Sequence, residues 1–400
     1  MLNDKTIETR VVHAGSDANP SHAVSMPIYQ SSTFRFDSCD HGASLSEQVA
    51  PTELYSRWGN PTTRALEEAV MDLEGGEAGL AFASGMAAGS AAVMASVKSG
   101  DHCVVANCLY AGMTELFEGV LDSFGVETTF VDPSDLAGME AAMRPNTVLI
   151  YVETPANPTL AITDLAEVAR IAKAHGALSI ADNTWASPLN QRPLELGIDA
   201  VVHSATKYLA GHSDVISGVA VGAKVWINRV WKMLKIFGAC PSPHDAWLVL
   251  RGIKTLAVRV PRQNATTQAV AEFLEGHAAV SMVHYPGLPS HPGHELAKRQ
   301  MHGFGGMLAF EVAKGEKAGR AVIEALKVAT HAVSLGGVET LAVHAASTTH
   351  APLSPEARTR GGVTPGLIRV SIGLESPQDL IADFDQALKH AESVTKAPSK

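Results

Sequence analysis

A lysine at the end of an apolar run is the first residue whose setting suggests chemistry. In the segment Val202-His-Ser-Ala-Thr-Lys-Tyr208, a strand-like run leads into Ser204, Thr206 and Lys207. An apolar environment disfavours the ammonium form of lysine, and the neutral amine can form an imine with an aldehyde. The hydroxyls of Ser204 and Thr206 are well placed to bind a phosphate. A surface lysine after a strand is also common, so this segment alone leaves both interpretations open.

An acidic residue ends a second apolar run. Asp182 lies in the segment Ala181-Asp-Asn-Thr-Trp185, and an acid at the end of a buried strand needs a partner. A protonated pyridine nitrogen would supply that partner, and the charged ring would then act as an electron sink. The alternative is that Asp182 only caps a helix.

A third segment has the pattern of a phosphate-binding turn. In Ala83-Ser-Gly-Met-Ala-Ala88, a strand ends, Ser84 and Gly85 follow, and a helix begins. Backbone N–H groups at a helix N-terminus bind phosphate readily, and a glycine lets the ligand approach closely. Gly85 and Met86 would present their N–H groups. An ordinary strand–helix turn is the alternative here.

These segments belong to a stretch in which helices and strands alternate. That alternation predicts an α/β fold with a mostly parallel sheet covered on both faces, and ligands bind such sheets at the carboxyl ends of the strands. The expected strands are Leu80–Ala83, His102–Ala106, Thr128–Val131, Thr147–Glu153, Leu178–Asp182 and Ala200–Ser204, and the expected helices are Thr63–Glu74, Gly85–Val97, Thr114–Phe124 and Leu165–His175.

The pattern changes at both ends of this stretch. Residues 1–60 lack a sustained period and predict an extended arm that packs on a neighbouring subunit, or else a partly ordered tail. Residues 61–245 form the predicted cofactor-binding domain. Residues 246–400 predict a smaller α+β domain, with helices at Asp245–Leu256 and Gln263–Glu275 and strands at Met307–Val312, Ala332–Leu335 and Ile368–Ile372.

Composition narrows the class of protein. The chain has 400 residues, of which 46% are hydrophobic and 18% charged, so it can bury a large core. A net charge of −10 argues against a nucleic-acid partner, since phosphate backbones need clustered Lys and Arg. We find no apolar segment long enough for a membrane span and no signal peptide, so we expect the cytoplasm. The four cysteines lack metal-ligand spacing, and no metal is expected.

Taken together and in this order, the segments resemble the pyridoxal 5′-phosphate (PLP) enzymes of cysteine and methionine metabolism. The resemblance runs from about residue 8 to 390 and rests on Tyr55-Ser-Arg-Trp-Gly-Asn-Pro-Thr62, Leu73-Glu-Gly-Gly-Glu77, Ser84-Gly-Met86, Asp182-Asn-Thr184, His203-Ser-Ala-Thr-Lys-Tyr208, Gly211-His-Ser-Asp214, Ser334-Leu-Gly-Gly337 and Ile368-Arg-Val-Ser-Ile-Gly-Leu-Glu375. It implies the aspartate aminotransferase-like fold, fold type I. Such enzymes are typically tetramers built from two catalytic dimers.

The resemblance also implies a role for each matched residue. Lys207 would hold the cofactor as a Schiff base and later move protons, Asp182 would pair with the pyridine nitrogen, and Tyr110 would stack on the ring and act as acid or base. The phosphate would be held by Ser84, Gly85, Met86, Ser204 and Thr206, and by Tyr55 and Arg57 of the neighbouring subunit. Asn157 and Thr184 would complete the cofactor site, and Ser334 and Arg369 would bind the substrate α-carboxylate.

Within this family the chain most resembles the branch of methionine γ-lyase and cystathionine γ-lyase, with departures at positions that select the substrate. Methionine γ-lyases carry a cysteine where this chain has Gly112, and a Lys-Asp pair where it has Lys235 and Ile236. Enzymes that act on cystathionine usually carry a glutamate at the position of Val333 and an arginine at that of Glu115. Gly112 and Ile236 argue against methionine as the main substrate, and Val333 and Glu115 argue against cystathionine.

Glu115 is the most informative departure. A carboxylate there would repel an anionic side chain and could pair with a guanidinium, which offers parallel N–H donors. Canavanine has such an end, so the leading hypothesis is a γ-lyase for canavanine or another substrate with a cationic distal group. A solvent-exposed Glu115 without a role is the simpler alternative. Other hypotheses are a methionine or homocysteine γ-lyase, an O-acyl-homoserine sulfhydrylase or cystathionine γ-synthase, and an inactive regulator with this fold.

Overall fold

A seven-stranded sheet organises the first two thirds of the chain. In the computed structural model, which describes residues 4–349, 351, 358 and 361–396, the strand order is β1-β7-β6-β5-β4-β2-β3. Strand β7 alone runs antiparallel to the others in this sheet. The strands are β1 (Ala78–Phe82), β2 (His102–Ala106), β3 (Glu127–Val131), β4 (Thr147–Glu153), β5 (Leu178–Asp182), β6 (Ala200–His203) and β7 (Gly218–Gly222).

Helices cover this sheet and begin and end at residues suited to that role. Helix α3 (Pro61–Glu74) starts with Asn60 as N-cap and Pro61 in the first turn, and Gly75 ends it in the left-handed conformation. Helix α7 (Leu165–His175) has an aspartate N-cap and a glycine C-cap in the same way. Helix α4 (Gly85–Met94) packs against β6 and β7, and α7 packs against β4 and β5. The strands between them are almost wholly apolar, as expected for strands buried on both faces.

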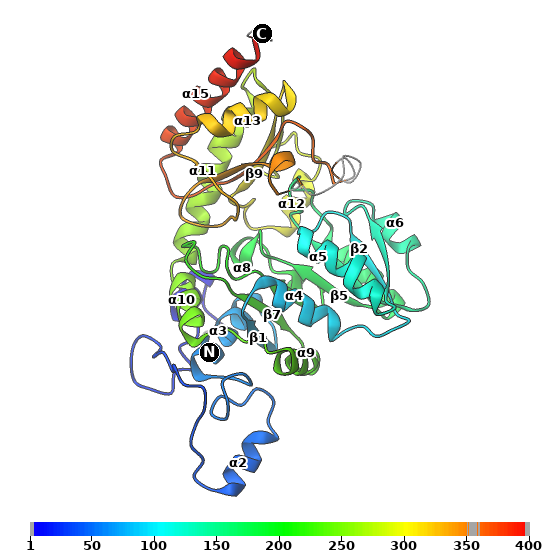
Figure 1. The fold of residues 1–400 in the computed structure, drawn as a ribbon, viewed down its shortest axis with the longest axis vertical. Coiled ribbons are helices and arrows are strands. Elements are labelled where there is room, and N and C mark those ends of the chain that lie inside the picture. Colours follow the sequence, from blue (N-terminus) through cyan, green and yellow to red (C-terminus); the bar gives the residue numbers. More distant parts are fainter. Residues whose placement is uncertain (1–3, 350, 352–357, 359–360, 397–400) are drawn as a thin grey trace.

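A second sheet forms the C-terminal part of the molecule (Figure 1). Its strand order is β10-β11-β12-β9-β8, and every pair except β10 and β11 is antiparallel. The strands are β8 (Val280–His284), β9 (Met307–Val312), β10 (Thr330–His331), β11 (Leu341–His344) and β12 (Leu367–Ser371). Helices α13 (Gly315–Ala325) and α15 (Pro377–Lys396) pack together, and α13 lies on strands β9, β11 and β12.

One long helix connects the two sheets. Helix α11 (Leu256–Glu275) follows α10 (Pro243–Ile253) and runs along the axis of the molecule in Figure 1. Near its start, Arg259 donates hydrogen bonds to the carbonyl oxygens of Tyr208 and Gly252, each at 2.9 Å. One turn later, Gln263 donates to the carbonyl oxygens of Gly337 and Ile372 at 2.8 and 3.1 Å. The helix is therefore bonded to the loop after β6, to the loop between β10 and β11, and to the residue that follows β12.

The N-terminal segment extends away from both sheets. Figure 1 shows it at the opposite end of the molecule from the C-terminus, with α2 (Cys39–Ser46) farthest out. Helix α1 (Ile7–His13) packs against α3, and a single bridge joins Thr33 to Tyr55. That this arm contacts a neighbouring subunit, and that the domains divide near residue 245, remain predictions.

Most predicted elements are present within a few residues, and five are observed with the predicted bounds: β2, β4, α7, β5 and β9. The predicted strand Ala332–Leu335 is wrong, because the strand there is only Thr330–His331 and the following residues form a loop. The helix predicted at Thr114–Phe124 is α5 (Ala111–Glu115) followed by a π-helical turn (Leu116–Leu121). Other helices are α6 (Leu136–Ala141), α8 (Ser187–Asn190), α9 (Lys224–Phe237), α12 (His294–Gln300) and the 3-10 turns Pro193–Leu196 and Ala345–Ser347.

No helix among the residues that the structure describes is long and apolar enough to cross a membrane.

Candidate active site

A cavity of about 490 Å³ opens at the carboxyl ends of the parallel strands. Its walls come from β4, β5, the loop after β6, the start of α4, the loop between β10 and β11, and β12. Both sheets therefore contribute to it. The predicted site residues that line it are Ser84, Gly85, Met86, Tyr110, Asn157, Asp182, Thr184, Ser204, Thr206, Lys207, Val333, Ser334 and Arg369.

Three predicted site residues are not in this group. Glu115 is exposed on α5 and does not line the cavity in the described part of this single chain. Tyr55 and Arg57 lie on the arm, where the Arg57 guanidinium is 5.5 Å from the centre of the Tyr55 ring. Arg57 also donates a hydrogen bond to the carbonyl oxygen of Lys235, at the end of α9.

Lys207 has the properties of a reactive amine. Its Nζ donates a hydrogen bond to Ser334 Oγ at 2.8 Å. Burial, and to a smaller extent the positive charge of Arg369, lower the pKa of Lys207 to about 8. A larger share of this amine is therefore neutral near physiological pH than in an exposed lysine, as attack on an aldehyde requires.

Ser334 and Arg369 are held together beside this amine. The Ser334 backbone has φ 88°, a left-handed conformation that is strained for a residue other than glycine. Its carbonyl oxygen accepts a hydrogen bond from Arg369 Nη2 at 3.1 Å, and Arg369 Nη1 donates to Asn157 Oδ1 at 3.2 Å. Burial lowers the pKa of Arg369 to about 10. A buried guanidinium to which no carboxylate of the described residues is bonded is suited to bind the carboxylate of a small substrate.

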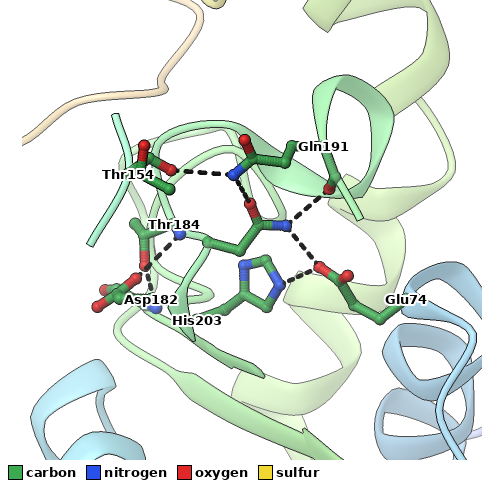
Figure 2. Close-up of polar contacts among 8 residues, drawn as sticks. Glu74, Thr154, Asp182, Thr184, Gln191 and His203 are labelled. Atoms are coloured by element: carbon green, nitrogen blue, oxygen red, sulfur yellow. Dashed lines mark hydrogen bonds and ion pairs between the residues drawn. The ribbon is translucent and has the colours of Figure 1, made fainter. Parts of the chain in front are cut away.

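The Asp182 carboxylate is fixed by the residue two positions after it. Thr184 donates its backbone N–H to Asp182 Oδ1 at 2.9 Å, and its side-chain hydroxyl bonds the same carboxylate. The Thr184 hydroxyl oxygen in turn accepts the N–H of Ser204 at 2.8 Å, which ties the end of β5 to the end of β6 (Figure 2). Burial raises the pKa of Asp182, while the bonds from Thr184 oppose that rise.

The N-terminus of α4 has the geometry expected of an anion site. Ser84 caps the helix by accepting the N–H of Ala87, which leaves the earlier N–H groups of Gly85 and Met86 to face a ligand. A Cβ atom added to Gly85 would lie 2.6 Å from Ser204 Cβ, so only glycine allows this close approach. Thr206 also lines the cavity, but its hydroxyl is bonded to the backbone of Ser217 and would have to turn to reach a phosphate.

Sequence reasoning missed several residues that line this cavity, among them Glu153 and Trp185. Glu153 is buried at the end of β4, beside Asp182 in register, and its Oε2 accepts the backbone N–H of Tyr110 at 2.8 Å. Burial and the charge of Asp182 raise the pKa of Glu153 well above its usual range. Trp185 lies under Arg369, whose guanidinium carbon is 5.8 Å from the ring centre. The signal for Glu153 was present, because an acid ends the predicted strand Thr147–Glu153 just as Asp182 ends the next one.

These residues fit a phosphorylated pyridine aldehyde. The N-terminus of α4 and Ser204 would hold the phosphate, Asp182 would accept the ring N–H, and Lys207 would hold the aldehyde carbon. Asn157 Oδ1 is engaged by Arg369, so its amide N–H remains to donate to the ring hydroxyl. The bound ring would supply an electron sink for the electrons of a broken bond.

Comparison with known proteins agrees with this arrangement. The family model of the Cys/Met metabolism PLP-dependent enzymes matches residues 8–389. The chain belongs to this family. PLP is its cofactor, and the chain has the fold type I architecture that the resemblance implied. Of the Cys/Met metabolism enzymes, the L-methionine gamma-lyase of Pseudomonas putida is 46% identical over 384 residues, which cover 95% of this chain and 96% of the relative.

Other relatives in the family have different names. A cystathionine beta-lyase of Lactococcus lactis is 46% identical over 386 residues, which cover 96% of this chain and 99% of that protein. The crystal structure of metB from Corynebacterium glutamicum matches with a TM-score of 0.90 and 42% identity, covering 97% of this chain and 98% of that one. The cystathionine gamma-lyase of Lactobacillus plantarum, solved with L-serine, matches with a TM-score of 0.91 and 40% identity, covering 97% and 100%.

Proposed function

We propose that the protein is a PLP-dependent γ-lyase that removes the γ substituent of an L-amino acid. The observation that carries this proposal is the triplet Lys207, Ser334 and Arg369, in which one serine touches both the amine and the guanidinium. An amino acid whose carboxylate binds Arg369 has its α carbon close to Lys207. The small amino-acid substrate follows from this geometry and from the family.

The reaction needs protons to be moved at neighbouring carbons. Lys207 is placed to take the proton from the α carbon, and its lowered pKa lets it act as a base near neutral pH. Tyr110 lines the same cavity and is half-exposed, so it faces the opening through which a γ substituent extends. We assign it the proton transfer to the leaving group. Elimination of a γ substituent also requires loss of a β proton, for which Lys207 is the nearest base.

For the distal group, we propose a cationic substituent such as that of canavanine, selected by Glu115. The carboxylate is exposed at the end of α5, the short helix that follows Tyr110, and Tyr110 lines the cavity. A charge-assisted hydrogen bond to a guanidinium-like group contributes roughly 1.5–3 kcal/mol.

A second candidate is a neutral thioether substrate such as methionine or homocysteine. Its support is the apolar lining that this chain gives the cavity, which includes Met113, Ile216 and Val333. Several relatives at 44–46% identity are named L-methionine gamma-lyase. An apolar wall favours an uncharged substituent, whereas the Glu115 carboxylate favours a cation.

The turnover of canavanine and of methionine by the native enzyme and by two variants distinguishes the two candidates. We expect Glu115→Gln to lower kcat/KM for canavanine about ten- to a hundredfold, because each 1.4 kcal/mol is about a factor of ten. The same change should leave methionine turnover nearly unaltered. Glu118→Gln is the matched control, because Glu118 is also exposed and lies three positions further along. Equal losses for both substrates would assign Glu115 a structural role, and no turnover of canavanine by the native enzyme would favour the thioether.

We also propose that the working enzyme is a homo-oligomer in which Tyr55 and Arg57 reach the phosphate of a neighbouring subunit. The support is that neither residue is among the described residues that line the cavity of its own chain, and that both belong to the segment 1–60 predicted as an arm. A cytoplasmic location remains an expectation from the sequence. A sulfhydrylase or synthase would replace the γ substituent with an added thiol, and product analysis with and without the thiol measures that replacement. Turnover of any substrate would exclude an inactive regulator.

A further inference from the structure

A buried acid–base pair lies behind the cofactor site. Glu74 is the last residue of α3 and His203 the last residue of β6, and His203 Nε2 is 2.6 Å from Glu74 Oε1. Their side chains are 0% and 1% exposed. Neither residue lines the cavity among the described parts of the chain, and the proposed reaction uses neither.

This pair is poorly explained by stability alone. Glu74 ends a helix, where the backbone carbonyl groups disfavour a negative charge. Its Oε2 is buried and has no hydrogen-bond partner among the described residues. Buried ion pairs seldom stabilise a fold more than apolar contacts of the same size, and an unsatisfied oxygen makes the comparison worse. The Glu74–His203 pair therefore points to a role other than stabilising the fold.

Hydrogen bonds connect the pair to the residue that follows Asp182 (Figure 2). Asn183, the next residue after Asp182, donates to Glu74 Oε1 at 2.8 Å and donates its backbone N–H to the carbonyl oxygen of Val202 at 3.0 Å. His203 directly precedes Ser204, whose N–H holds the Thr184 hydroxyl. Gln191 and Thr154 extend the network by a bond of 3.0 Å. The two residues that follow Asp182 are thereby held by hydrogen bonds.

The pair also acts on Asp182 through charge. A carboxylate oxygen accepts hydrogen bonds, so the 2.6 Å contact is a hydrogen bond when the Nε2 atom of His203 carries the proton. The charge interaction with His203 is among the causes that lower the pKa of Asp182, against the larger rise from burial. A negative Asp182 is the form that accepts a hydrogen bond from a protonated ring nitrogen.

We propose that Glu74 and His203 are positioning residues that keep Asp182 negative and aimed at the ring nitrogen of PLP. The inference rests on the family cofactor and is independent of which substrate is used. It predicts that replacing either residue weakens the contact of Asp182 with the ring nitrogen while the phosphate cradle stays intact. His203 acts through its charge and its place next to Ser204, and Glu74 acts by holding His203 and Asn183 in place.

The test compares PLP with 1-deaza-PLP, an analogue in which C–H replaces the ring nitrogen. We expect His203→Gln and Glu74→Gln to raise the dissociation constant of PLP about tenfold, the equivalent of one pKa unit. They should change that of the analogue by less than about twofold, since the analogue offers Asp182 no charged N–H. In the Asp182→Asn background, His203→Gln should have no further effect on PLP.

His102→Gln is the matched control. His102 is a buried histidine of the same sheet, at the start of β2, and it bonds Thr147 and Thr129 at 2.8 and 2.9 Å. It should alter the affinity for neither cofactor, and the unfolding temperature of each variant reports its fold. If His203→Gln does not fold, Glu74→Gln carries the test, because glutamine keeps an acceptor for His203. Equal losses with PLP and its analogue, or no loss with PLP, would overturn the proposal.

Discussion

The lowered pKa of Lys207 leads to a quantitative prediction about cofactor capture. At pH 7, a lysine with a pKa of about 8 is roughly 10% neutral, whereas one with the ordinary value of about 10.4 is roughly 0.04% neutral. The difference is a factor of about 200 in the reactive form. Because the neutral amine appears as the pH rises through the pKa, the rate of covalent attachment of PLP should rise with pH and level off above about 8.

Arg369 provides the perturbation. Burial is the larger cause of the shift and the charge of Arg369 the smaller one. Arg369→Met removes the charge and keeps an extended side chain, so the pKa of Lys207 should rise by only part of the distance to the ordinary value. Arg369→Lys keeps a positive charge and should leave the pKa of Lys207 nearly unchanged.

The assay mixes cofactor-free protein with PLP and follows the visible absorbance over a series of pH values. Lys207→Ala should abolish the phase that reports covalent attachment, which identifies it. A midpoint near the ordinary lysine value in the native chain would refute the burial argument. An equal midpoint in the native protein and in Arg369→Met would refute the part assigned to the charge of Arg369.

Three further outcomes are expected. Lys207→Ala should abolish turnover and leave the fold intact, and borohydride reduction of the native enzyme followed by peptide mapping should label Lys207 and no other lysine. Arg57→Ala should weaken PLP binding, and hybrids of Arg57→Ala with Lys207→Ala subunits should recover activity; verified mixed dimers without recovery would exclude a shared site. Gly85→Ala should weaken PLP binding, because its Cβ would lie 2.6 Å from that of Ser204, whereas Gly119→Ala, with no neighbour within 4 Å, should not.

The sequence was sufficient where the physical signal is local. Strand β5 is apolar until Asp182, and the segment before Lys207 has the same form, so both ends were predicted within a residue. Helix α7 has its aspartate cap and glycine stop in the sequence. Because parallel strands end at one edge of a sheet, alternation alone predicted that these residues meet.

The sequence was insufficient where a tertiary contact overrides local preference. Ala332–Leu335 contains residues that favour strands, yet Ser334 takes a left-handed backbone conformation and bonds both Lys207 and Arg369. Those partners lie 127 and 35 positions away in the chain, and no local pattern reports them. Strand β7 was missed because its sequence begins and ends with glycine, which disfavours strands. The pairing of Glu74 with His203 is likewise visible only in the folded molecule.

The connecting helix α11 imposes a mechanical condition on the site. Arg259 donates a hydrogen bond to the carbonyl oxygen of Tyr208, the residue after Lys207. Gln263, four positions further along the helix, donates to the carbonyl oxygens of Gly337 and Ile372, which lie three positions after Ser334 and Arg369. The rise per residue of a helix fixes the spacing of these two anchors at about 6 Å along its axis. The amine that carries the cofactor and the groups that bind the substrate carboxylate are thus attached to one rigid rod, although they come from different sheets.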